Sequence, residues 1–171
     1  MKVVCLLLVL VAAVAADKIP DFVVSGKCPA VDTEGLWNQQ RSEHARYAGV
    51  WYQQAITNNP YQPNKKCNRI EYSHDGQSFD AKTCGINAEV FAAPYTLLDT
   101  DYSNYACIYS CIDYNYGYYS DFAFIFTRSA TPSDNYIKKC LDVFQSYNVD
   151  SSRFERTEQG SSCPYDALKA L

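Results

Sequence analysis

Beyond its first sixteen residues, the sequence lacks any long run of apolar residues. A membrane-spanning helix needs about 18 or more consecutive apolar residues, and no stretch after Ala16 approaches that length. A basic stripe is missing as well, because the 15 Lys and Arg residues are scattered along the 171 residues and the formal net charge is −4. We therefore expect a protein that binds neither nucleic acid nor a membrane.

The sequence also lacks the short motifs of common catalytic and metal sites. It has no serine-nucleophile motif, no phosphate-binding glycine loop and no paired catalytic carboxylates. The spacing of Cys107 and Cys111 is not that of a zinc knuckle, and His44 and His74 are isolated from any ligand cluster in the sequence. No Asn-x-Ser/Thr sequon occurs. These absences favour a binding protein over an enzyme and predict no metal site.

The one apolar run that is present lies at the start of the sequence. Val3–Ala16 follows Lys2 and ends on Val14-Ala15-Ala16, where small residues occupy the positions that a signal peptidase reads. We interpret residues 1–16 as a cleaved secretory signal peptide and residues 17–171 as a single domain. The protein is therefore expected to be secreted and extracellular.

Cysteine is abundant for a chain of this length. Of the eight cysteines, Cys5 would leave with the signal peptide, so seven remain. In an oxidising compartment these are candidates for disulfide bonds before they are candidates for metal ligands, and one must stay unpaired. The seven are Cys28, Cys67, Cys84, Cys107, Cys111, Cys140 and Cys163.

Aromatic and β-branched residues concentrate in short runs that end at turn residues. Asn58-Asn59-Pro60 and Asp75-Gly76 are such boundaries. Six short strands in sequential order indicate an antiparallel meander, which forms either a sandwich or an up-and-down barrel. The predicted strands are residues 50–57, 68–73, 78–85, 95–102, 105–114 and 120–128.

A single amphipathic helix is predicted after the last strand. Thr131 can cap it, Pro132 suits its first position, and Asn148 is a plausible end. Apolar residues at spacings of three, four and seven give it one buried face, so it should pack outside the sheet. That face consists of Ile137, Cys140, Leu141 and Phe144.

The two nearby cysteines predict which face of their strand points outward. Residues four apart in a strand point the same way, so Cys107 and Cys111 share a face with Tyr105 and Tyr109. If Cys140 of the helix reaches this strand from outside, the cysteine face is the outer one. The inner face then carries Ala106, Ile108, Ser110, Ile112 and Tyr114.

Three signatures follow one another along this meander. Gly49-Val50-Trp51 opens the first strand, Thr100-Asp101-Tyr102 closes the fourth, and Arg128 ends the last. Together they resemble the three motifs of the lipocalins over nearly the whole mature chain, which implies an all-β, antiparallel, up-and-down barrel with one C-terminal helix outside. Arg128 can stack its guanidinium over the indole of an inward Trp51 and hold the base of the barrel shut.

Longer segments resemble the type I crustacyanin subunits, which are the astaxanthin-carrying lipocalins of crustacean shell. These segments include YAGVWYQ, FAAPY, TDYSNYAC, SDFAFIF and GSSCPYD. The resemblance implies the disulfide bonds Cys28–Cys111, Cys67–Cys163 and Cys107–Cys140; the sequence alone would leave about 15 pairings open.

The chain departs from this resemblance between Ile86 and Phe91. A hairpin of about 25 residues is missing there, so six strands are expected in place of eight. The sheet could still close if the strand ending at Gly85 pairs with the one beginning near Tyr95, or it could stay open. Cys84, the odd cysteine, lies beside this gap as a buried inert thiol, an intermolecular disulfide partner or a nucleophile inside the barrel.

Alternation along the outer strands predicts a surface for a ligand. With Trp51 inward, Gln53, Ala55 and Thr57 follow by period two, and an inward Arg128 places Phe122, Phe124 and Phe126 on the same wall. An apolar wall with sparse polar anchors suits a long hydrophobic ligand, although the phenylalanines could equally be ordinary core. The resemblance adds Gln53, Gln62 and Tyr72 as partners for oxygens on a carotenoid end ring.

The sequence therefore predicts a secreted carrier of astaxanthin or a related carotenoid that pairs with a second crustacyanin-type subunit and contributes to shell colour. Two alternatives stay open. One is a shortened lipocalin that has lost or weakened ligand binding and acts as an interaction subunit. The other is an enzyme that uses the Cys84 thiol inside the barrel.

Overall fold

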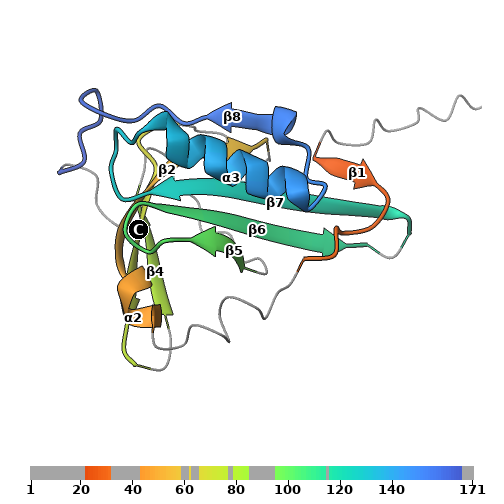
Figure 1. The fold of residues 1–171 in the computed structure, drawn as a ribbon, viewed down its shortest axis with the longest axis horizontal. Coiled ribbons are helices and arrows are strands. Elements are labelled where there is room, and N and C mark those ends of the chain that lie inside the picture. Colours follow the sequence, from red (N-terminus) through yellow and green to blue (C-terminus); the bar gives the residue numbers. More distant parts are fainter. Residues whose placement is uncertain are drawn as a thin grey trace, which may run out of the picture.

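A computed structural model describes six stretches of the chain and Gln62, and a curved antiparallel sheet dominates them (Figure 1). The stretches are residues 22–31, 43–58, 66–76, 79–84, 95–114 and 116–166. The eight strands are β1 (Val23–Ser25), β2 (Gly49–Thr57), β3 (Arg69–His74), β4 (Phe79–Cys84), β5 (Thr96–Thr100), β6 (Tyr105–Asp113), β7 (Tyr118–Thr127) and β8 (Phe154–Arg156). Two α-helices, α2 (His44–Tyr47) and α3 (Asp134–Ser146), and the short 3-10 helix η2 (Ser151–Arg153) accompany them in these stretches.

The strands are joined in the order β4-β3-β2-β7-β6-β5. This order confirms the predicted meander, with the first long strand, β2, paired to the last, β7. Figure 1 shows the sheet bending, so that β3 and β4 run across the direction of β6 and β7. The two short strands that were not predicted lie off this path: β1 pairs with the start of β7, and β8 pairs with the end of β2.

The sheet is open among the described residues. The closing pair considered from the sequence would join β4 to β5, but these strands lie at opposite ends of the path and no described residues pair them. The fold is therefore a half-barrel of six main strands with α3 on its outer side. Residues 1–16, which the sequence predicts to be a signal peptide, and the junction from Ile86 to Phe91 lie outside the described residues.

Helix α3 begins two residues later than predicted. Ser133, not Thr131, is the N-cap: its backbone is extended, and its side chain accepts a hydrogen bond from the Asn135 amide at 3.4 Å. Pro132 therefore precedes the cap instead of opening the helix. At the other end, Asn148 adopts a left-handed conformation with φ of 61°, which fits the predicted stop. No helix in the described part of the chain is long and apolar enough to cross a membrane.

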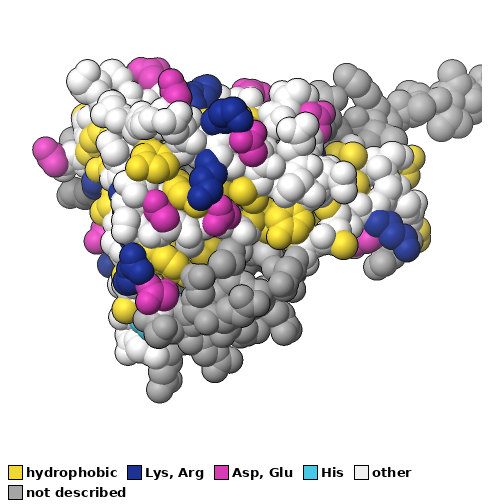
Figure 2. Space-filling view, in the orientation of Figure 1, with side chains coloured by type: hydrophobic (Ala, Val, Ile, Leu, Met, Phe, Trp, Pro, Cys, Tyr) yellow, Lys and Arg dark blue, Asp and Glu magenta, His cyan; other side chains and the backbone are white. Residues whose placement is uncertain are grey.

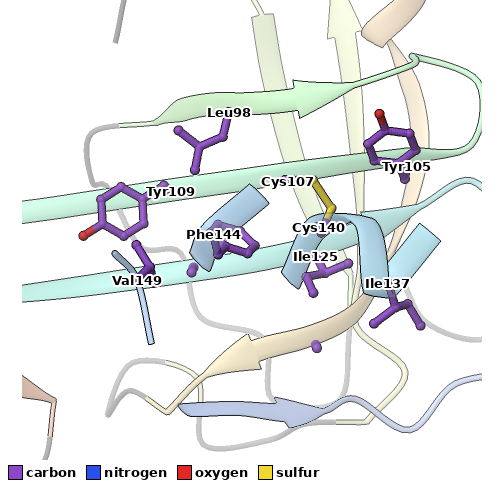
Figure 3. Close-up of a cluster of buried hydrophobic side chains, with 11 residues drawn as sticks. Leu98, Tyr105, Cys107, Tyr109, Ile125, Ile137, Cys140, Phe144 and Val149 are labelled. Atoms are coloured by element: carbon purple, nitrogen blue, oxygen red, sulfur yellow. A yellow bond between two sulfur atoms is a disulfide. The ribbon is translucent and has the colours of Figure 1, made fainter. Parts of the chain in front are cut away.

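The outer face of the sheet and helix α3 enclose one hydrophobic core (Figure 3). The Cys107–Cys140 disulfide joins β6 to α3, which confirms that the cysteine face is the outer one. Tyr105 stacks on Tyr136 of the helix with ring centroids 5.8 Å apart. The pairs Cys28–Cys111 and Cys67–Cys163 are also present, so all three predicted disulfides are confirmed.

A β-bulge in β2 changes which side chains face inward. Gln53 lies opposite Phe126, but Ala55 lies opposite Ile125, so Gln54 is an extra residue. Ile125 belongs to the outer core, and Ala55 packs there with it. The prediction that Ala55 and Thr57 face inward is therefore wrong, because strict alternation holds only up to Gln53.

Candidate ligand-binding face of the sheet

The inner face begins at Trp51 and Arg128, as the sequence predicted. The Arg128 guanidinium carbon lies 3.8 Å from the centroid of the Trp51 indole. The same guanidinium donates to the backbone carbonyls of Tyr102 (3.1 Å), Val50 (3.1 Å) and Arg46 (2.6 Å). Gly49 has φ of +99°, and a Cβ there would lie 3.1 Å from Arg128 Nη1, so this position requires glycine. These contacts fix one end of the half-barrel.

The Thr100-Asp101-Tyr102 motif forms the turn between β5 and β6. Asp101 Oδ1 accepts hydrogen bonds from the amides of Ser103, Asn104 and Tyr105 at 2.7–3.2 Å. Burial raises the pKa of Asp101, but hydrogen bonds from Asn104, Tyr105 and Ser103 outweigh that effect and leave the pKa below its usual value. The motif is a structural turn that delivers Tyr102 to the inner face.

Three phenols meet beside this end of the sheet, and only Tyr72 among them was predicted as a site residue. Tyr72 donates to Tyr95 Oη at 2.9 Å, and the hydroxyls of Tyr47 and Tyr95 are 2.6 Å apart. Burial raises the pKa of the Tyr47 and Tyr72 phenols, that of Tyr72 to about 12. The sequence signal for Tyr47 was its position just before Gly-x-Trp, since a short helix there turns its ring onto Trp51.

Two of the predicted polar anchors contact each other directly. Gln62 Nε2 donates to Gln53 Oε1 at 3.0 Å, and Gln53 Nε2 donates to Thr157 Oγ1 at 2.9 Å. Gln159 then donates to the backbone carbonyls of Gln53 and Asn68. Gln53 is 2% exposed. The structure thus brings Gln53 and Gln62 together and adds Thr157 and Gln159. The sequence did not predict the last two, because they lie after the helix in a segment without a recognisable strand pattern.

The predicted apolar wall is present on β6 and β7. Phe126 lies opposite Ala106, Phe124 opposite Ile108, and Phe122 opposite Ser110. Phe124 and Phe126 stack with ring centroids 5.9 Å apart. Phe126 and Ile108 belong to a second hydrophobic core with Trp51, Tyr47, Tyr72, Leu97, Tyr102 and Ala106.

Ser110 is the unusual member of this wall. It is 3% exposed, and its hydroxyl has no hydrogen-bond partner among the described residues. A buried hydroxyl without a partner is costly, so this position favours a further hydrogen-bond partner on the inner side. Its cross-strand neighbour Phe122 places it on the inner face.

Two other sequence observations have different outcomes. His44 and His74 were isolated in the sequence, but their rings lie edge to face with centroids 6.2 Å apart. Among the described residues, no group of three or more His, Cys, Asp or Glu side chains could hold a metal ion. Cys84 ends β4, and its side chain lies outside the described residues.

The outer side of β2 and β3 carries a separate pocket of about 450 Å³. It does not involve the predicted ligand residues. Its lining residues are Tyr52, Arg69, Cys163, Pro164, Tyr165 and Asp166. Figure 2 shows a face on which basic and acidic side chains are interspersed, without a continuous basic stripe among the described residues.

The chain matches known proteins over most of its length. Residues 76–161 match the family described as the lipocalin / cytosolic fatty-acid binding protein family. The crustacyanin-C1 subunit of Homarus gammarus is 53% identical over 181 residues, which cover 91% of this chain and 100% of that protein. The crustacyanin-A1 subunit of the same organism is 52% identical with the same coverage.

Solved structures agree with these matches. Lobster apocrustacyanin A1 superposes with a TM-score of 0.81 at 51% identity, covering 88% of this chain and 98% of that one. Insecticyanin from the tobacco hornworm Manduca sexta has a TM-score of 0.68 at 20% identity, covering 84% and 92%, which is a likeness of fold alone.

Part of the crustacyanin-C1 sequence has no counterpart here. The match spans 181 residues, whereas 91% of this 171-residue chain is about 156 residues. About 25 positions of the relative are therefore unmatched. This number agrees with the length of the predicted missing hairpin.

Proposed function

This chain belongs to the lipocalin family, and we propose that it carries a long hydrophobic pigment, astaxanthin or a related carotenoid, against the inner face of its sheet. Membership in this family of binding proteins argues against an enzyme built on Cys84. The same proposal includes secretion after removal of residues 1–16, an extracellular location in the shell or cuticle, and pairing with a second crustacyanin-type subunit.

The arrangement of polar and apolar groups on the inner face supports the proposal. Ile108, Phe124 and Phe126 form an apolar wall, and burial of a polyene on such a wall supplies about 25 cal/mol per Å². The amides of Gln53 and Gln62 and the phenol of Tyr72 are the polar groups that would orient a ring oxygen.

The unpartnered hydroxyl of Ser110 is the observation that carries the proposal. A core that served only to stabilise the fold would bury an apolar side chain between Ile108 and Ile112 on this face. The Ser110 hydroxyl can donate to an acceptor that enters from the inner side, such as a ring carbonyl or a bridging water. The ligand would be held by burial and hydrogen bonds, with no covalent bond made or broken.

Absorbance spectroscopy tests this proposal directly. Refolded mature protein mixed with astaxanthin should retain pigment through gel filtration and shift its visible absorbance maximum. Tyr72→Phe and Ser110→Ala should each weaken retention by about 5–10-fold, the effect of one hydrogen bond. Tyr52→Phe, on the outer face, is the matched control and should retain pigment normally. A wild-type protein with neither retained pigment nor a spectral shift would contradict the proposal.

A second function has an observation in its favour. The side chain of Gln53 is already hydrogen bonded to Gln62 and Thr157, and the inner core closes around Trp51 and Tyr47. A half-barrel filled by its own side chains would act as an interaction subunit without a ligand. This function predicts that the pigment-free protein still binds the second subunit type in a pull-down and that astaxanthin changes neither the amount bound nor the spectrum.

A further inference from the structure

The topology leaves strand β4 at one end of the sheet. It pairs with β3 on one side, and no described strand pairs with it on the other. The residues at its centre, Asp80, Ala81 and Lys82, are all exposed. Because an edge strand presents unpaired backbone N–H and C=O groups, it is a template for another strand. We propose that β4 pairs antiparallel with β4 of a second copy of this chain.

Symmetry restricts the register of such a pair. Two identical strands that extend one sheet are related by a twofold axis perpendicular to the sheet, so each copy keeps its outer side chains on the same face. Directly opposite residues in an antiparallel pair share a face. Since side chains alternate between the two faces along a strand, the two residue numbers in each pair must both be odd or both be even. This condition excludes every register that would pair an odd-numbered residue with an even-numbered one.

Charge selects among the registers that remain. Asp80 and Lys82 lie on one face, opposite Ser73 and Glu71 of β3. Placing Asp80 on the axis would oppose two aspartates, and placing Lys82 there would oppose two lysines. With Ala81 on the axis, Asp80 of each copy lies opposite Lys82 of the other. This register makes two opposite-charge pairs and no like-charge pair.

The neighbouring strand favours the same register. Lys82 lies opposite Glu71 of β3. In this register Asp80 of the second copy lies on the other side of Lys82, so the charges alternate in sign from strand to strand. Neither Asp80 nor Lys82 forms an ion pair with another described residue, so both charges are available. Charged side chains on an edge oppose indiscriminate pairing. On β4 their alternation permits pairing in one register and opposes the adjacent ones.

Sedimentation velocity on the refolded mature protein tests this proposal without pigment. The wild type should pass from monomer to dimer as concentration rises. Asp80→Lys and Lys82→Asp should each weaken dimerisation about tenfold, since the twofold axis doubles every new like-charge contact. The double variant Asp80→Lys/Lys82→Asp should restore it. Lys138→Asp, an exposed change on α3, is the control and should leave dimerisation unchanged.

A crosslinking measurement fixes the register independently of charge. In a Cys84→Ser background, Ala81→Cys should form a covalent dimer on mild oxidation, because the two thiols face each other across the axis. Ser73→Cys on β3, which is also exposed, should stay monomeric. A monomer at all concentrations, a species larger than a dimer, or single charge reversals without effect would each overturn the proposal. Failure of astaxanthin binding would not affect it.

Discussion

Arg128 connects three separate backbone segments through one guanidinium. Replacing it by Lys keeps the charge but loses the planar fork that donates to Tyr102, Val50 and Arg46 while covering Trp51. We expect Arg128→Lys to lower the free energy of unfolding by about 1–3 kcal/mol, since two partly buried carbonyls lose their donors and the indole loses its planar cover. Urea denaturation followed by tryptophan fluorescence measures this change.

Lys138→Gln is the control for the Arg128 variant. Lys138 forms an exposed i,i+4 ion pair with Asp142 on α3, and such pairs contribute about 0.5 kcal/mol or less. Its loss should barely move the midpoint. Equal destabilisation by the two substitutions would show that Arg128 does not tie these segments together.

The phenol cluster makes stability depend on alkaline pH. The pKa of Tyr72 is raised from 10.0 to about 12 in the folded protein. The unfolded chain therefore loses this proton at a lower pH than the folded protein does, and the free energy of unfolding falls as the pH rises from 10 towards 12. Tyr72→Phe cannot ionise and should reduce the alkaline loss of unfolding free energy by on the order of 1–3 kcal/mol. Urea titrations at pH 9 and 11.5 compare the two proteins.

Tyr116→Phe provides the matched comparison at high pH. Tyr116 is 87% exposed at the β6–β7 turn, so removing its hydroxyl should change stability by less than about 0.5 kcal/mol at either pH. Parallel pH curves for wild type and Tyr72→Phe would mean that Tyr72 ionises as easily in the folded protein as in the unfolded one.

Single residues were predictable where a motif or strict alternation specified them. Trp51 and Arg128 lie where the motifs placed them, and Phe124 lies where period-two counting from Arg128 placed it. Ser110 faces inward, as the cysteine face of its strand predicted. Tyr95 was not predicted as a site residue, because it hydrogen bonds to Tyr47 and Tyr72, which are distant in the sequence. No local sequence pattern indicates such a contact. The pairing of Gln53 and Gln62 with each other likewise depends on a loop that alternation does not describe.

At the scale of elements, the start of α3 allows a direct test of a corrected prediction. Ser133→Ala removes the side chain that accepts from the Asn135 amide and should cost about 1 kcal/mol of stability. Thr131→Ala, at the position that the sequence favoured, should cost less than about 0.5 kcal/mol. Thermal unfolding of both variants by circular dichroism distinguishes them, and the reverse order of effects would restore Thr131 as the cap.

The elements themselves followed from the sequence more closely than their ends did. All six main strands and the outer helix were predicted, since aromatic and β-branched runs between turn residues are strong local signals. The strands β1 and β8 were not predicted, because a run of three residues carries too weak a local signal. They form by pairing with the start of β7 and the end of β2, which are distant in the sequence. The helix cap was misplaced because both Thr131 and Ser133 are good cap residues.

For the whole molecule, the absence of about 25 residues that crustacyanin-C1 has leads to a prediction for a chain in which they are inserted. Inserting between Gly85 and Tyr95 the segment that crustacyanin-C1 has and this chain lacks should supply strands for the free edge of β4. We expect the melting temperature to rise by about 5 °C or more, because additional apolar surface is buried. The proposed β4 dimer should be lost at the same time, which sedimentation velocity would detect.

A flexible insertion of the same length is the control for the whole-molecule experiment. A Gly/Ser segment lengthens the connection at a small entropic cost and offers no strand, so it should not raise the melting temperature. If both insertions behave alike, the open edge is not a consequence of the shortened chain.

The bulge at Gln54 sets how β2 could change in length during evolution. Because Gln54 is the extra residue, its deletion would cost its hydrogen bonds to Ser129 and Ala130 yet leave Gln53 inside and Ala55 under the helix. Removing a residue elsewhere in the strand would instead carry side chains to the wrong face. Insertions and deletions in β2 are therefore expected to accumulate at this one position.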